Sequence, residues 1–301
     1  MYPDQPRLRI AVCLTALVIG TSGCCSFGNR ANQQNVIAAR KLTSHGLNAL
    51  YKGQAAQATR LLNQACEANP DDSRIRHHLA NSLVAQGEVE SAIRHLKLAI
   101  QQAPDDPALH VQLGNLYLQQ GQSWAAREQS IEALNLNRQL AEAWLLRGRS
   151  ERAAGNLDEA IDSLHRAEAY ADEVPEIRLE LAATWIDQGQ PLRALTAMEI
   201  HNAAIAEDQL PMPAVELTGQ ALVDLKQFDR ARRLLWDAHR RPGASPKVWI
   251  LLSRAQLFSG DPSSARRTAM SAKHAFPDNP QVAAWLGQMT SFTDPAMQAA
   301  R

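Results

Sequence analysis

A spacing of 34 residues recurs along most of the chain and constrains its fold more than any other feature. One alanine series keeps this step at Ala58, Ala92, Ala126, Ala160 and Ala194, and after one offset of 37 it resumes at Ala231 and Ala265. A second series runs through Ala65, Ala99, Ala133, Ala167, His201, Ala238 and Ala272, and glycines recur at Gly53, Gly87, Gly121, Gly155 and Gly189. Independent series with one period predict a stack of similar structural units.

Each unit is predicted to contain two short helices. A glycine falls midway through most units, where a tight, left-handed turn favours glycine over other residues. Pro70, Pro104 and Pro277 fall where the second helix should end, because proline disrupts a helix interior. Aromatic residues make up only 5% of the chain, which also favours helices over strands.

The motifs within the units resemble the tetratricopeptide repeat family. The third unit reads Leu113-Gly114, Tyr117, Gly121, Ala126, Ala133, and the fourth reads Trp144, Gly148, Gly155, Ala160, Leu164, Ala167. The resemblance implies an all-α, right-handed superhelical solenoid of about seven helix-turn-helix repeats. We expect the units at 39–72, 73–106, 107–140, 141–174, 175–208, 212–245 and 246–279. Residues 280–301 are then a capping helix and a frayed tail.

Some units depart from the family pattern. Ala49, Glu151 and Gln256 stand where the family prefers an aromatic residue or leucine, and Lys226 replaces the turn glycine of the sixth unit. The longer offset between the fifth and sixth units, around Gln209-Leu210-Pro211, predicts a bend or a longer loop.

The N-terminus has the pattern of an export signal. Arg7 and Arg9 precede an uncharged apolar run over residues 10–20, which is shorter than the roughly 20 residues of a membrane-spanning helix. Thr21-Ser22-Gly23-Cys24 then resembles the lipobox of bacterial lipoproteins. That resemblance implies cleavage of residues 1–23, lipidation of Cys24 and a tether over 24–38. The alternatives are an uncleaved signal anchor and an apolar start without function.

The signal predicts an exported protein held at a membrane of the cell envelope, on the periplasmic side.

The rest of the chain excludes several functions. Lys and Arg together number 31, as do Asp and Glu, and this balance argues against a nucleic-acid binder. The sequence contains no P-loop, dinucleotide glycine pattern, HExxH or CxxC motif, so we predict no enzyme, small-molecule substrate or cofactor. Adjacent histidines on a helix point about 100° apart, so His77 and His78 are predicted to be solvated surface residues rather than metal ligands.

The family resemblance implies a concave groove lined by the first helix of each unit. One inward position is occupied in successive units by Leu47, Asn81, Asn115, Arg149, Ala183, Gln220 and Arg254. Asn81 and Asn115 resemble the asparagine ladders of peptide-binding members of the family, and an amide can both donate to and accept from an extended peptide backbone. Arg74, His77 and Arg152 are further predicted groove contacts. The lysine of the family's carboxylate clamp is missing, with Thr43 and His77 in its positions, so no specificity for a C-terminal carboxylate is expected.

Charge is also graded along the predicted groove, from Arg40, Arg74 and His77 to Glu176, Glu180, Asp187, Glu216 and Asp224. Such a gradient can orient a bound segment. We therefore predict a non-catalytic, lipid-anchored scaffold that binds a protein or peptide partner. Its layout is similar to that of bacterial lipoproteins with such repeats that assist pilus, secretin or envelope assembly. The alternative is a structural homo-oligomer whose groove takes no foreign ligand.

Overall fold

The fold is built from α-helices alone over the residues described by the computed structural model, which are 22–171, 174–203 and 205–293, with side chains between 33 and 289. These ranges contain fifteen α-helices, one 3-10 helix and no strand. The predicted all-α class, with seven helical pairs and a terminal helix, is confirmed. The chain divides into two compact units, residues 1–109 and 110–301, which are described in turn.

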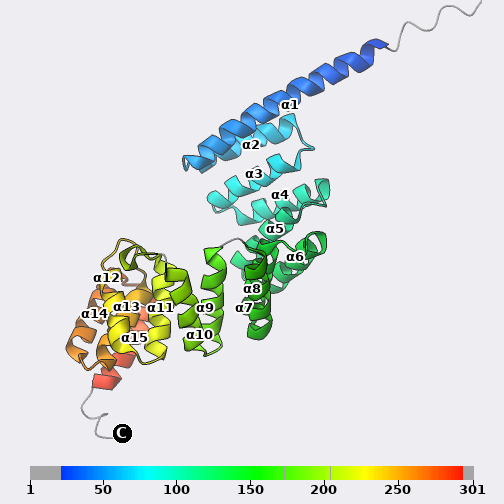
Figure 1. Cartoon of the computed structure of the whole chain (residues 1–301). Coiled ribbons are helices and arrows are strands. Elements are labelled where there is room, and N and C mark those ends of the chain that lie inside the picture. The colour runs from blue at the N-terminus through cyan, green and yellow to red at the C-terminus, as the bar shows by residue number, and fades with distance from the viewer. Residues whose placement is uncertain (1–21, 172–173, 204, 294–301) are drawn as a thin grey trace, which may run out of the picture. The chain divides into compact units, whose positions relative to one another are not determined.

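The first unit contains two helical pairs. Its helices are α1 (Ser22–Tyr51), α2 (Ala55–Ala68), α3 (Ser73–Ala85) and α4 (Val89–Gln102), and each packs against the next. The C-terminal half of α1 pairs with α2, while its N-terminal half extends past that partner (Figure 1). The segment predicted as a tether, 24–38, is therefore helical. None of the described helices is both long and apolar enough to cross a membrane.

The second unit begins within α5 and contains five pairs and a final helix. Its helices are α5 (Pro107–Gln119), α6 (Ser123–Leu136), α7 (Ala141–Ala154), α8 (Leu157–Tyr170), α9 (Pro175–Asp187), α10 (Pro191–Asn202), α11 (Met212–Asp224), α12 (Phe228–Ala238), α13 (Pro246–Phe258), α14 (Pro262–Ala275) and α15 (Pro280–Thr293). The segment between α10 and α11 holds the 3-10 turn Glu207–Gln209, and Leu210 anchors that segment in the core with 4% exposure. The final helix α15 covers the last repeat, because its Val282 and Trp285 are buried against α13 and α14.

Small residues allow the two helices of each repeat to approach closely. The first alanine series, from Ala58 to Ala265, is fully buried. A Cβ atom added to Gly148 would lie 2.6 Å from Cγ of Leu164, and one added to Gly219 would lie 2.8 Å from Cδ2 of Leu235. Both distances are too short for carbon atoms in contact. Each leucine therefore fills the space that the missing side chain leaves. The small residues that recur every 34 positions lie where the backbones of the paired helices approach most closely.

The turns between the paired helices use a left-handed backbone. Gly53, Gly87, Gly121, Gly155 and Gly189 have φ between 73° and 86°. Lys226 holds the same turn of the sixth repeat with φ of 59°, and it is the one non-glycine residue with positive φ in the described part of the chain. An L-residue in this conformation carries strain of roughly 1–2 kcal/mol, because its Cβ approaches the following carbonyl.

Replacing Lys226 by Gly should relieve this strain and raise the midpoint of thermal unfolding by about 2–4 °C, the change that roughly 1 kcal/mol produces in a large domain. Gly189→Lys is the matched control: it places lysine in the equivalent turn of the fifth repeat, where a Cβ would meet no atom within 4 Å. Circular dichroism should show opposite shifts for the two variants. A lowered midpoint for Lys226→Gly would show that the lysine side chain stabilises its turn.

Candidate partner-binding face

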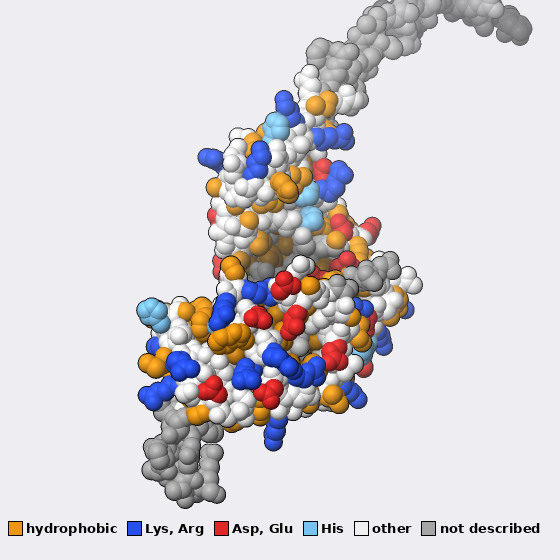
Figure 2. All heavy atoms as spheres, turned by 60° about the vertical axis from the view of Figure 1, so that its left-hand side comes forward, with side chains coloured by type: hydrophobic (Ala, Val, Ile, Leu, Met, Phe, Trp, Pro, Cys, Tyr) orange, Lys and Arg blue, Asp and Glu red, His pale blue; other side chains and the backbone are white. Residues whose placement is uncertain are grey.

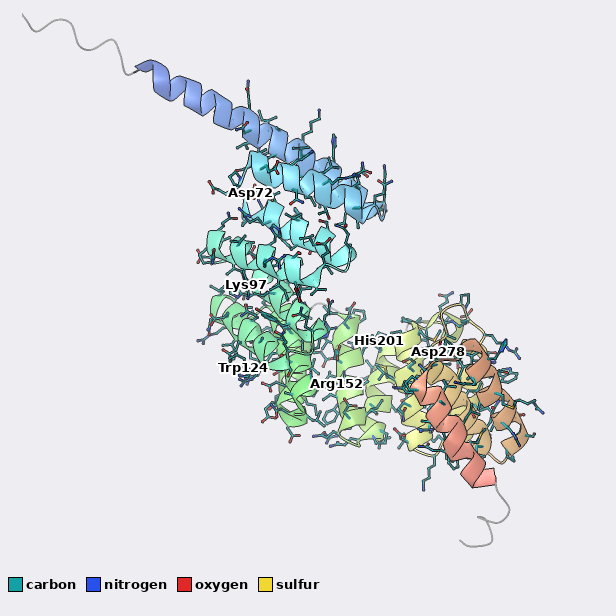
Figure 3. The ribbon with its side chains drawn as sticks, turned by 180° about the vertical axis from the view of Figure 1, so that it is seen from behind. Asp72, Lys97, Trp124, Arg152, His201 and Asp278 are labelled. Carbon is teal, nitrogen blue, oxygen red and sulfur yellow. The ribbon has the colours of Figure 1, made fainter. Side chains whose placement is uncertain are left out.

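The first helices of successive repeats contact one another and form one face of each unit. In the first unit α1 contacts α3, and in the second α7, α9, α11 and α13 contact in succession. These contacts place the first helices on the inner side of the stack. The predicted groove residues all lie on these helices: Arg74, His77 and Asn81 on α3, Asn115 on α5, and Arg149 and Arg152 on α7 (Figure 3 labels Arg152).

In the first unit the predicted contacts on α3 differ in exposure. Arg74 is 77% exposed, and its Nε and Nη2 donate to the two carboxylate oxygens of Asp72 at 3.1 Å. These hydrogen bonds lower the pKa of Asp72, which also caps α3 through the backbone N–H of Arg74. Asn81 is half-buried. The Arg74 guanidinium is therefore held at the start of the helix by its own turn.

His77 and His78 are half-buried rather than solvated, and their rings stack at 5.4 Å with an interplanar angle of 14°. Burial lowers the pKa of His78, and the neighbouring His77 lowers it further. Over the described residues no three His, Cys, Asp or Glu side chains converge as metal ligands.

In the second unit the predicted arginines join two repeats through a chain of ion pairs. Arg149 Nε donates to Oε1 of Glu180 at 2.7 Å, and Arg152 Nη1 donates to Oε2 of the same carboxylate at 3.0 Å. Arg152 Nε donates in turn to Oδ2 of Asp187 at 2.7 Å. These side chains are between 20% and 46% exposed, so they form a fixed polar surface that water and a partner can reach.

Other acidic residues of the predicted gradient also have partners. Glu216 accepts a hydrogen bond from Ser245 Oγ at 2.6 Å, and Asp224 accepts from Gln220 Nε2 at 2.8 Å. Acidic and basic side chains alternate over the surface of this unit in Figure 2. The face of the second unit is thus a set of local pairs, not a field of one sign, and it offers oriented donors and acceptors rather than net charge.

Glu151, in the position where the family prefers an aromatic residue, is buried with polar partners that the sequence did not identify. Its side chain on α7 is 2% exposed. Arg127 Nε on α6 donates to it at 2.6 Å, and Asn156 Nδ2 in the following turn donates at 2.8 Å. Burial raises the pKa of the Glu151 carboxyl, but these hydrogen bonds outweigh burial and the net shift is downward.

Gln256 occupies the same position in the seventh repeat and is likewise buried, and its Oε1 accepts from Thr268 Oγ1 at 2.7 Å. The departures from the family pattern are therefore compensated by polar partners on neighbouring helices. In the sequence each of these sites appears as a polar residue at a core position. Such a residue needs a hydrogen-bonding partner, but the sequence does not identify that partner.

Family models agree with the helical pairs. One model described as "Tetratricopeptide repeat" matches residues 49–99 and 222–289, and a second with the same description matches 111–175 and 145–208. A third, described as "TPR repeat", matches residues 80–121. Together they cover more than half of the 301 residues. The chain belongs to the tetratricopeptide repeat family. No curated protein sequence matches it.

Solved structures share the fold at low sequence identity. A tetratricopeptide repeat protein from Parabacteroides merdae ATCC 43184 aligns with a TM-score of 0.66 and 15% identity, over 84% of this chain and 99% of that one. Pseudomonas aeruginosa pilF aligns at 0.56 and 14%, over 86% and 100%. A chain of the Cut9-Hcn1 hetero-tetramer of the APC/C aligns at 0.69 and 14%, over 81% of this chain but 48% of its own length. These similarities establish the fold of this tetratricopeptide repeat chain.

Removing the arginine that pairs with the buried Glu151 carboxylate should be costly, while removing both partners should not. Arg127→Ala leaves the Glu151 carboxylate buried beside Asn156 alone, and we expect a loss of about 2–3 kcal/mol in the free energy of unfolding. Arg127→Ala combined with Glu151→Leu restores the leucine that repeats two and six carry at this position, Leu83 and Leu222, and should recover most of the loss. Denaturant unfolding measures both variants. Equal stability of Arg127→Ala and the wild type would contradict the assignment.

Proposed function

We propose that this tetratricopeptide repeat chain is a non-catalytic scaffold that binds an extended segment of a protein partner along its first-helix face. The observation that carries the proposal is the polar chain Arg149–Glu180–Arg152–Asp187, which is fixed across two repeats and still partly exposed. Asn115 precedes it on α5 of the same unit, and Asn81 holds the same position on α3 of the first unit.

The chemistry of this face suits a peptide backbone. An extended segment carries unpaired N–H and C=O groups that lose hydrogen bonds to water when it binds. Amide side chains such as Asn115 can replace both kinds of bond, since they donate and accept. The paired guanidinium and carboxylate groups are held by one another, so little side-chain freedom is lost on binding. Their mixed sign selects polar segments of a partner and does not favour a strongly charged polymer.

We further propose that the protein is exported and lipid-anchored through Cys24, and that it serves in the assembly of an envelope or secretion apparatus. Support comes from the sequence alone, namely the apolar run over residues 10–20 and the lipobox-like Thr21-Ser22-Gly23-Cys24. Residues 1–21 and the side chain of Cys24 lie outside the described residues.

Replacing Asn81, Asn115 and Arg149 together by Ala should lower capture of the partner by at least about tenfold, since three hydrogen bonds contribute roughly 0.5–1.5 kcal/mol each. The measurement is quantitative affinity purification of the full chain from its own cells. Arg60→Ala, Glu132→Ala and Asp162→Ala, combined in one variant, are the control, because these exposed residues lie on the second helices.

Helicity of both variants is checked by circular dichroism. Unchanged capture by the groove variant, with its helicity intact, would remove the proposal. Light scattering of the wild-type protein separates the structural-oligomer alternative: concentration-dependent self-association that the groove variant abolishes would favour that alternative over a foreign partner.

The anchor is tested by metabolic labelling with a fatty-acid analogue. The wild type should incorporate label, Cys24→Ser should lose it, and Cys25→Ser should keep it, because the pattern places the lipidated thiol at Cys24. Label that persists in Cys24→Ser would refute this anchor.

A further inference from the structure

A pocket of about 520 Å³ lies in the fourth and fifth repeats, and none of its lining residues belongs to the polar chain Arg149–Glu180–Arg152–Asp187. Second helices α8 and α10 form its walls, and the first helix α9 lies between them. We call it the outer pocket and define it by its lining residues: His165, Glu168, Arg178, Leu181, Trp185, Leu192, Arg193, Thr196, Ala197 and Ile200. Its size is that of a ligand-binding cavity.

The outer pocket is mainly apolar, and part of its apolar surface is exposed. Leu181 and Trp185 of α9 lie at its base, while Leu192 and Ile200 of α10 are 63% and 58% exposed. Leu192, Thr196 and Ile200 follow one another at intervals of four residues, so they form a stripe along one side of α10. Large apolar side chains exposed beside a cavity mark an interaction surface.

The charges at the rim are unequal. Glu168 is the one carboxylate among the lining residues, and it is already 3.4 Å from Arg178 Nε and 3.7 Å from His165 Nδ1. The Arg193 guanidinium does not pair with that carboxylate. It lies over the Trp185 ring instead, 4.6 Å from the ring centroid. The two arginines thus outnumber the carboxylate. A positive rim around an apolar base is complementary to a segment that is apolar on one side and acidic beside it.

The pocket favours a helix over an extended strand. All three helices around it satisfy their backbone groups internally, and the Thr196 hydroxyl donates to the Leu192 carbonyl of its own helix at 3.1 Å. An extended segment would therefore leave its own N–H and C=O groups without partners on the apolar base. A helix brings its backbone already bonded and presents apolar side chains at i, i+3 or i+4, and i+7, as in helix-in-groove recognition.

We infer that the outer pocket binds an amphipathic helix of a partner protein, with apolar residues on Leu181, Leu192 and Ile200 and acidic residues toward Arg178 and Arg193. The site shares first helix α9 with the first-helix face, but it uses none of the polar chain Arg149–Glu180–Arg152–Asp187. One chain of this scaffold can then hold an extended segment on one side and a helix on the other.

A labelled synthetic helix of about 18 residues provides the probe, since shorter helices are marginal in water. It carries leucine at i, i+4 and i+7 with glutamates beside them, and a matched peptide has lysine in place of every glutamate. Fluorescence anisotropy with the full chain should show saturable binding of the acidic peptide and at least about tenfold weaker binding of the lysine peptide. Equal binding of both peptides, or no saturable binding of the acidic one, would overturn the inference.

Ile200→Glu should weaken binding of the acidic peptide by at least about tenfold, because it places a negative charge on the apolar stripe and repels the peptide's glutamates. Ile37→Glu is the matched control, since Ile37 is an isoleucine of similar exposure, 65%, on α1. Arg193→Glu should weaken the acidic peptide and strengthen the lysine peptide. Equal effects of Ile200→Glu and Ile37→Glu would refute the pocket as the site.

The Asn81, Asn115 and Arg149 variant should bind the acidic peptide like the wild type, because none of these three residues lines the outer pocket. A second copy is the competing occupant of the pocket. Sedimentation that shows wild-type dimers dissociated by Ile200→Glu would replace the inferred helix with self-association.

Discussion

The close contact between the paired helices of each repeat is the interaction on which the rest of the structure depends. It needs glycine or alanine at one helix and leucine at the other, as Gly148 and Leu164 show. Because each repeat makes this contact internally and then packs only on its neighbours, stability is distributed along the chain rather than concentrated in one core. A change at one repeat, such as the buried Glu151 carboxylate, can therefore be compensated by Arg127 of the preceding helix without altering the period.

This packing also decides which surfaces are left for function. The small residues and leucines occupy the sides on which the two helices of a pair meet. The remaining side of first helices α5 and α7 is polar, with Asn115, Arg149 and Arg152 on it, and the pocket between second helices α8 and α10 is mainly apolar. The two surfaces differ in chemistry. The first helices present amides and ion pairs, whereas the pocket presents the exposed apolar side chains Leu192 and Ile200. The same scaffold thus offers one site for an extended backbone and one for a helix.

The 34-residue period predicted the fold, because alanines at this spacing indicate close packing of helices and glycines at this spacing indicate turns between them. It also predicted the left-handed turns at the glycines and the helix that covers the last repeat. It did not predict which charges would pair. The partners of Arg152 lie 28 and 35 residues away on another helix, and their pairing depends on side-chain rotamers that spacing does not contain. The outer pocket was missed because three helices line it, and the 34-residue period does not show which of their side chains leave a cavity.

Photo-crosslinking in living cells can show whether the first-helix face receives the partner. A benzophenone amino acid in place of Glu142 lies on α7, two turns from Arg149 and exposed on the same face. The control replaces Met270, 59% exposed on second helix α14 and outside the outer pocket. We expect a discrete cross-linked partner from position 142 and none from position 270. Equal products from both positions, or a partner captured from position 270 alone, would contradict it.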